Sequence, residues 1–173
     1  RVLERAVCEA REEGMKVFFD LNFRSKLWSY DQARAFLENI AHSVHVLFVR
    51  QEDMGPLFSL AGDPGDMASR LQQRFGCEAV VLTQGAERVV AALPDRIASR
   101  KAILTQSLNR IGVGDSFVAG FIYGYTCKDV DTALAYGTAM AALKTTIPNE
   151  NRPIISLRQV EKLIASLDGA AGR

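Results

Sequence analysis

Short apolar runs alternate with helical segments along this chain, and the alternation restricts the folds that it can adopt. Runs with strand character occupy residues 16–20, 44–49 and 79–83, and each follows a segment in which apolar residues recur at helical spacing. Two shorter runs, at residues 89–93 and 102–104, are expected to form an antiparallel edge. This order predicts an α/β fold with a mostly parallel sheet that helices flank on both faces.

The helical segments are marked by their apolar periodicity and by residues that begin or end helices. Ser29 or Asp31 is expected to cap the second of them, and the Gly- and Pro-containing stretch 61–65 is expected to be a surface turn. Ligands of such sheets bind at the carboxyl ends of the strands, so polar residues directly after each strand are candidates for a site. The predicted helices cover residues 1–13, 31–41, 66–75, 116–126, 130–143 and 156–166.

One loop, residues 109–117 (NRIGVGDSF), places two glycines and a carboxylate at the predicted start of a helix. Backbone N–H groups of a Gly-x-Gly turn at a helix N-terminus bind anions, so Gly112, Val113 and Gly114 are expected to form an anion site. Asp115, in the first turn, would act as the catalytic base that accepts a proton from a substrate hydroxyl. On spacing alone, a turn that only caps a helix is an equally good interpretation.

Two better-known glycine loops do not fit this spacing. A dinucleotide-binding fingerprint needs a third glycine where this chain has Phe117. A P-loop needs Gly-Lys-Ser/Thr where the chain has Phe-Val-Ala at residues 117–119. The loop therefore predicts phosphoryl transfer of another kind.

Charge and composition favour a small-molecule ligand. A formal net charge of +1 over 173 residues provides no electrostatic footprint for nucleic acid or for an anionic membrane. No apolar run is long enough to cross a bilayer, and no signal peptide is recognised. Cys8, Cys77 and Cys127 lie far apart, which argues against a zinc site or a disulfide framework and for a reducing, cytoplasmic location. His42 and His45 have no acidic or cysteine partner at ligand spacing, so we expect no metal there.

Three blocks of the sequence resemble one enzyme family. Residues 112–125, GVGDSFVAGFIYGY, resemble the signature of the ribokinase-like (PfkB) family of sugar kinases. Residues 19–28, FDLNFRSKLW, are similar to the D-x-N-x-R-x-x-L-W segment of its 2-keto-3-deoxygluconate kinase branch. Residues 142–148, ALKTTIP, are similar to a segment of bacterial members of that branch. The blocks occur in family order and span most of the chain.

The resemblance implies a ribokinase-like fold, in which residues 1–173 form the C-terminal portion of a single kinase domain without its N-terminal part and lid. The implied reaction is ATP-dependent phosphorylation of a sugar acid, 2-keto-3-deoxygluconate, to its 6-phosphate. The implied cofactors are ATP and Mg²⁺, with a monovalent cation as a further candidate, and the implied partners are the sugar acid, ATP and a second copy of the chain. The 173 residues alone are expected to be inactive.

The resemblance also assigns roles to residues outside the glycine loop. Arg24 would hold the substrate carboxylate through two parallel hydrogen bonds, and Asn22 would orient the same substrate-binding loop. Glu52 and Asp53 occupy the place of an acidic motif that holds magnesium indirectly through water, although an acidic pair at a helix start is equally well explained by the helix dipole. The residues implied in nucleotide binding are Thr83, Gly85 and Asn149.

Several residues depart from the family pattern, and they keep two alternatives open. One is a fructokinase-type enzyme for a neutral sugar, which would leave Arg24 without a carboxylate to hold. The other is a non-catalytic or truncated relative that only binds a ligand. Trp28 is expected to be a packing residue. The departures are Arg50 for asparagine, Arg88 for glycine, Asn109 for aspartate, Val113 for a small residue and Asn149 for glycine.

Overall fold

The computed structural model describes residues 2–106, 108–148 and 155–171. The chain forms two compact units, Arg1–Ala98 and Ser99–Arg173. The first unit contains the parallel strands and the second contains the glycine loop with three helices. None of the described helices is long and apolar enough to cross a membrane.

The sheet has five strands in the order β1-β2-β3-β4-β5. β1 (Phe18–Asp20), β2 (Val46–Arg50) and β3 (Ala79–Thr83) run parallel, with Phe19 opposite Leu47 and Leu47 opposite Val80. β4 (Arg88–Ala92) is antiparallel to β3, so the predicted antiparallel edge is confirmed. Residues 46–49 and 79–82 are buried whichever face of the sheet their side chains point to, as expected of covered parallel strands.

The last strand lies five residues earlier than the sequence predicted. β5 covers Ile97–Lys101, whereas the run at residues 102–104 lies outside any strand. A tight turn at Pro94 and Asp95 explains the difference, because the Leu93 N–H donates to the Arg96 carbonyl at 2.8 Å and the chain re-enters the sheet immediately. β5 was missed because its last three residues, 99–101, are polar and the segment contains no apolar run.

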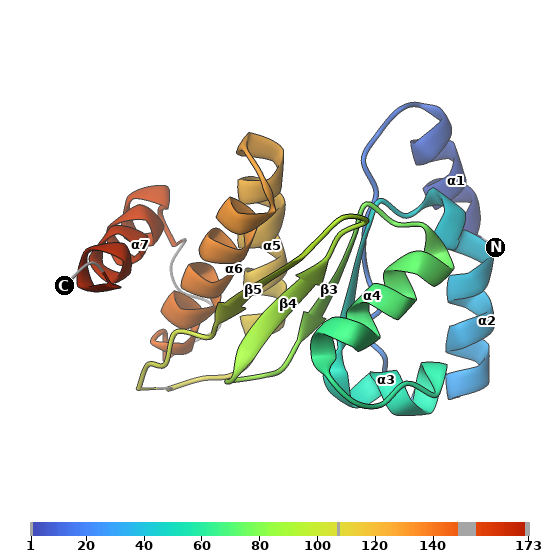
Figure 1. Cartoon of the computed structure of the whole chain (residues 1–173), viewed down its shortest axis with the longest axis horizontal. Helices are drawn as coiled ribbons and strands as arrows, with labels where there is room; N and C mark the ends of the chain where they lie inside the picture. The colour runs from blue at the N-terminus through green and yellow to red at the C-terminus, as the bar shows by residue number, and fades with distance from the viewer. Residues whose placement is uncertain (1, 107, 149–154, 172–173) are drawn as a thin grey trace. The chain divides into compact units, whose positions relative to one another are not determined.

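In the described part of the first unit lie four α-helices, α1 (Val2–Glu12), α2 (Tyr30–Ile40), α3 (Gln51–Phe58) and α4 (Pro64–Phe75), and one short 3-10 helix, η1 (Ala41–Ser43) (Figure 1). Ser29 caps α2, because its hydroxyl accepts the Gln32 N–H while the Gln32 side chain accepts the Ser29 N–H. α4 begins two residues before the prediction, since Asp63 caps it and Pro64 occupies its first turn. The expected surface turn therefore ends at Asp63.

α3 was not predicted as a whole helix. It starts directly after β2, and Gly55 and Pro56 are poor helix formers that hid its periodicity. Its stability comes from packing, because Met54 and Leu57 are fully buried. Trp28 lies partly buried against the core, with its ring 5.7 Å from that of Phe36, which confirms its packing role.

The second unit is built on the contact between α5 (Val113–Cys127) and α6 (Val130–Thr145), with α7 (Leu157–Ala171) after them. Three glycines let α5 and α6 approach closely. A Cβ added at Gly120 would lie 2.6 Å from the Tyr136 carbonyl oxygen, and one at Gly124 would lie 2.7 Å from Ala133 Cα. One at Gly137 would lie 2.7 Å from the Phe117 ring. The glycines of the GVGDSFVAGFIYGY segment thus have a packing function besides the loop.

His45 connects three segments of the first unit. Its Nδ1 accepts the Val17 N–H at 2.9 Å, and its Nε2 lies 2.8 Å from Arg11 Nη1. Burial, followed by the nearby Arg11 charge, lowers the pKa of His45 below its ordinary value of 6.5. Among the described residues no cluster of His, Cys, Asp and Glu could hold a metal ion. The two contacts of its ring nitrogens give His45 a structural role.

We expect Gly124→Ala to lower the free energy of unfolding by about 1–3 kcal/mol, because the new methyl group overlaps the α6 backbone and forces the helices apart. Gly114→Ala in the same helix is the control, since a Cβ there meets nothing within 4 Å. Chemical denaturation followed by circular dichroism measures both variants. Equal stability of the two would contradict the packing role.

We also expect His45 to make the chain less stable in acid. Because its pKa is lowered in the folded state, the unfolded chain binds more protons in the window just below pH 6.5, and the unfolding free energy falls as the pH drops through that window. His45→Asn keeps an acceptor for the Val17 N–H and removes the titration. Denaturation at pH 7.5 and 5.5 should show a smaller loss in His45→Asn than in the parent, whereas His42→Asn should retain the full loss.

Candidate functional site

A groove lies at the carboxyl ends of β1 and β2, where the sequence predicted polar ligands. The loop after β1 and the start of α3 form its walls. Its lining contains three cationic side chains and two carboxylates. The lining residues are Phe23, Arg24, Ser25, Lys26, Leu27, Tyr30, Arg50, Glu52 and Asp53.

The loop after β1 turns sharply at Asn22. Asn22 has φ +39°, and its N–H donates to Asp20 Oδ1 at 3.0 Å. The Arg24 carbonyl then accepts the Leu27 N–H at 2.9 Å, which closes a turn and leaves the Arg24 side chain exposed in the groove. No ion pair of Arg24 or Lys26 occurs among the residues that the structure describes. Two cations are therefore available to an anionic ligand.

Arg50, in contrast, is fully engaged. Its Nε donates to Asp53 Oδ2 at 2.9 Å, its Nη1 lies 2.6 Å from Glu52 Oε1, and its Nη2 donates to the Phe23 carbonyl at 3.1 Å. The guanidinium thus ties the first turn of α3 to the loop after β1. From the sequence, Arg50 was identified only as a departure from the family pattern, although its i,i+3 spacing from Asp53 indicates an ion pair.

Burial raises the pKa of Asp53 above its ordinary value, and the hydrogen bond and charge of Arg50 lower it in part. The Asp53 side chain is only 6% exposed, against 38% for Arg50. Glu52 and Asp53 are both paired with Arg50, so direct binding of a divalent cation by these carboxylates would have to break their ion pairs. A role through water stays a prediction.

A second groove adjoins the first and shares Arg50 and Glu52 with it; Gln51, Thr83, Gln84, Gly85 and Glu87 complete its lining. Gly85 has φ +58° in the turn between β3 and β4, where the Gln84 N–H donates to the Arg88 carbonyl at 3.0 Å. A Cβ on Gly85 would meet nothing within 4 Å, so the backbone is open to a ligand. Arg88, which replaces a family glycine, donates to Gln84 Oε1 at 2.8 Å and holds this loop.

The glycine loop belongs to the second unit. α5 begins at Val113, three residues before the predicted start, and Gly112 caps it with φ +72°. The Ser116 N–H donates to the Gly112 carbonyl at 2.9 Å as the first bond of the helix. By helix geometry the N–H groups of residues 113–115 have no intrahelical acceptor, and Asp115 is exposed beside them. Asn109, which departs from the family aspartate, still stabilises the backbone before this turn, because its Oδ1 accepts the Ile111 N–H at 2.9 Å.

The predicted site residues fall into two groups. Arg24, Glu52 and Asp53 line one groove, and Thr83 and Gly85 line the adjoining one. Gly112, Val113, Gly114 and Asp115 form the helix start of the other unit. Asn149 lies outside the described residues. Lys26 was not predicted from the sequence, and its position two residues after Arg24 was the available signal.

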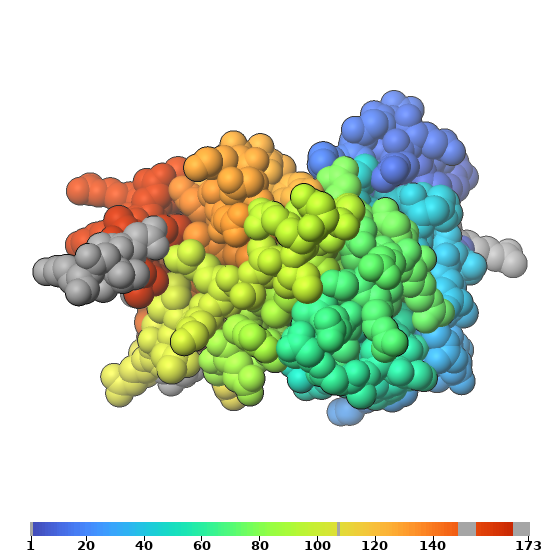
Figure 2. Space-filling model, in the orientation of Figure 1, coloured from blue at the N-terminus to red at the C-terminus, as the bar shows by residue number. Residues whose placement is uncertain are grey.

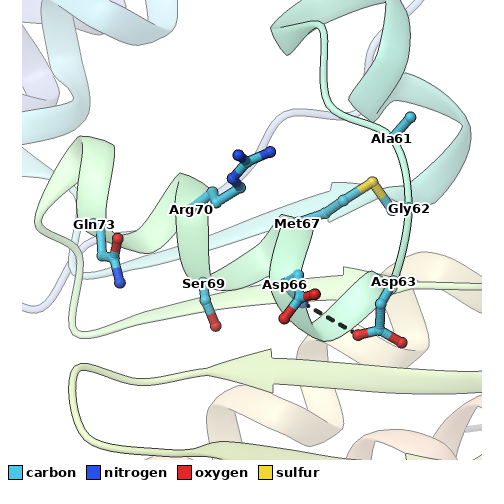
Figure 3. Close-up of a pocket in the computed structure, with 8 residues that line it drawn as sticks. All are labelled: Ala61, Gly62, Asp63, Asp66, Met67, Ser69, Arg70 and Gln73. Carbon is cyan, nitrogen blue, oxygen red and sulfur yellow. Dashed lines mark hydrogen bonds between the residues drawn. The ribbon is translucent and has the colours of Figure 1, made fainter.

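A further hollow along α4 involves none of these residues (Figure 3). The green atoms of α4 lie at the molecular surface in Figure 2. Asp63 and Asp66 lie at the end of the hollow, where Asp63 Oδ1 accepts the Asp66 N–H at 3.2 Å (Figure 3). That bond belongs to the cap of α4 and gives the carboxylate a structural function.

Comparison with known proteins gives consistent matches. A family model described as pfkB family carbohydrate kinase matches residues 2–155. A 2-dehydro-3-deoxygalactonokinase of Haloferax volcanii is 35% identical over 165 residues, which cover 95% of this chain and 52% of that protein. A 5-dehydro-2-deoxygluconokinase of Bacillus subtilis is 27% identical, with 92% and 50% covered. The chain spans about half the length of these relatives.

Solved structures share the fold. A 2-dehydro-3-deoxygluconokinase of Thermotoga maritima matches with a TM-score of 0.84 at 24% identity, over 95% of this chain and 54% of that one. A Vibrio cholerae fructokinase in a fructose-, ADP- and calcium-bound form matches with a TM-score of 0.80 at 21% identity, over 92% and 54%. A ribokinase II structure from E. coli also matches, with a TM-score of 0.82 at 19% identity over 95% and 52%. The predicted ribokinase-like α/β fold is therefore confirmed.

We expect Arg50→Met to lower the unfolding free energy by about 1–3 kcal/mol at pH 7, less than for a fully buried pair because Arg50 is partly exposed. Without the guanidinium, burial raises the pKa of Asp53 further, so the carboxyl protonates more readily and the loss should shrink as the pH falls toward 4.5. Denaturation of Arg50→Met, Asp53→Asn and the double variant measures the coupling. If Arg50→Met lowered the unfolding free energy of the parent and of the Asp53→Asn variant by the same amount, the proposed coupling of Arg50 and Asp53 would be refuted.

Proposed function

The chain belongs to the pfkB family of carbohydrate kinases, and we propose that it transfers the γ-phosphoryl group of ATP to a hydroxyl of a 2-keto-3-deoxy sugar acid. The observation that carries the proposal is the start of α5, where an exposed carboxylate lies beside N–H groups that have no acceptor within the helix. Because the chain spans about half the length of its relatives, the proposal concerns its part in the whole enzyme.

In the proposed reaction Asp115 accepts the proton of the sugar hydroxyl as its oxygen attacks the γ-phosphorus. The new P–O bond forms while the bond to the β,γ-bridging oxygen breaks, and ADP leaves with that electron pair. The N–H groups of Val113, Gly114 and Asp115 stabilise the negative charge of the group in transit, because they have no competing acceptor in the helix. The positive φ of Gly112 supports this role, since it sets the direction of the first turn.

Arg24 is proposed to hold the carboxylate of the sugar acid. Its exposed guanidinium lies in the first groove together with Lys26, whereas Arg50 is neutralised by its own carboxylates. A groove with two available cations favours an acid over a neutral sugar. We propose 2-keto-3-deoxygluconate, converted to its 6-phosphate, as the substrate, and its galactonate epimer is the natural comparison because one relative carries that name.

Thr83, Gly85 and Asn149 are proposed to contact the nucleotide. The open backbone at Gly85 supports this for the second groove. A divalent cation bound to the nucleotide would neutralise phosphate charge, and a monovalent cation remains part of the proposal. The Vibrio cholerae fructokinase is described in forms with ADP and calcium or potassium. Glu52 and Asp53 contribute to metal binding here only through water.

We expect Asp115→Asn to reduce kcat about 10²- to 10⁴-fold, because the amide cannot accept the proton. Phosphorylation is assayed in the 173-residue chain and in a fusion that places the N-terminal half of the Haloferax volcanii relative before it. The chain alone should show no turnover. Asp66→Asn, which alters an exposed carboxylate in the first turn of α4, should leave kcat unchanged. An active fusion that is insensitive to Asp115→Asn would reject the base.

Arg24→Met should raise KM for both epimeric sugar acids at least about tenfold, because the carboxylate loses a two-point contact. Phosphorylation of fructose, if it occurs, should not change. Steady-state kinetics of the fusion on the three sugars provides the comparison. A preference for fructose that Arg24→Met leaves intact would favour the neutral-sugar kinase. A folded fusion that binds ADP without turnover on any of them would favour a non-catalytic relative.

A further inference from the structure

The side chain of Lys144 lies beside the glycine turn. A Cβ built on Gly112 would be 3.4 Å from Lys144 Cε, which is an ordinary packing contact for the end of an alkyl stem. The ammonium group is one bond beyond that carbon. Lys144 is therefore next to the residue that caps α5, although 32 positions along the chain separate the two residues (144 − 112).

The end of α6 is fixed to the approach of the glycine turn by several hydrogen bonds. The Thr145 carbonyl accepts the N–H groups of Leu108 and Asn109 at 2.8 and 3.2 Å. The Thr145 hydroxyl bonds that of Thr105 and also donates to the Ala142 carbonyl at 2.7 Å. These bonds hold the backbone of Lys144 in register with the turn.

The positive charge of Lys144 has no protein counter-charge in the part of the chain that the structure describes. No carboxylate there forms an ion pair with it, and the nearest acidic residue in the sequence of the turn, Asp115, is exposed without a cationic partner among the described residues. Placement in the last turn of α6 gives Lys144 a favourable dipole interaction, but that interaction would hold for any orientation of the side chain. The position of Lys144 Cε beside Gly112 specifies one orientation of the stem.

We propose that Lys144 is a phosphate-binding residue, whose ammonium group pairs with the transferring phosphoryl group at the start of α5. The inference rests on the function proposed above and adds a charge to its anion site. Three N–H groups supply partial positive charges, and Lys144 supplies a full positive charge. Its attraction is strongest for the negative charge that accumulates on the phosphoryl group during transfer. Lys144 touches the phosphoryl group and has no part in proton transfer.

The test compares Lys144→Met, which keeps the stem that packs on Gly112, with Lys144→Arg, which restores the charge. In the active fusion, Lys144→Met should lower kcat about 10- to 100-fold with a smaller change in the KM of the sugar, and Lys144→Arg should recover part of the loss. Lys162→Met, an exposed lysine of α7, is the control. Unfolding of each variant by urea shows whether stability changes.

A binding measurement separates this inference from the proposed function. Tripolyphosphate is titrated into the 173-residue chain, and the amide NMR signals of Gly112 and Gly114 are followed in the parent and in Lys144→Met. Binding that weakens about tenfold in Lys144→Met supports the inference even if the fusion proves inactive, which would reject only the kinase function. Unchanged binding, absence of binding in the parent, or a kcat loss matched by a loss of stability would overturn it.

Discussion

Burial of the two central strands is the constraint on which the first unit depends. Residues 46–49 of β2 and 79–82 of β3 are withdrawn from water on both faces, which requires apolar side chains at consecutive positions and leaves no polar group before the strands end. Polar chemistry is therefore confined to the loops that follow. Because β1, β2 and β3 are parallel, those loops emerge at one edge, and Arg24, Arg50 and Thr83 come to line two adjoining grooves.

Three departures from the family pattern have structural explanations in these contacts. Arg50 joins α3 to the loop after β1, Arg88 holds Gln84 in the β3–β4 turn, and Asn109 accepts an N–H in front of the glycine turn. In each case the substituted side chain stabilises a loop of the proposed site. The departures therefore change which charges a ligand meets: Arg50 pairs with two carboxylates, which leaves one net negative charge in that cluster, while Arg24 and Lys26 form no ion pair among the described residues of the same groove.

The accuracy of the sequence predictions followed the strength of the local signal. Ser29 and the strand at residues 79–83 were predicted correctly, because a capping residue and a β-branched run act over a few positions. β5 and α3 were displaced or missed, since each is stabilised by neighbours that the local sequence does not contain. The start of α5 was placed three residues late for a related reason, as the positive φ of Gly112 permits a helix to begin where glycines predict a turn.

The sequence by itself determined the alternation of strands and helices, the Gly-x-Gly-Asp turn on which the proposed anion site depends and the resemblance that led to the kinase family. These properties depend on residue type and short spacing. Only the tertiary structure decided which charges are neutralised and which remain available, because ion pairs depend on distances between segments. The partners of Arg50 and the position of Lys144 against Gly112 belong to that class. Both follow from helix and loop packing that no single stretch of sequence encodes.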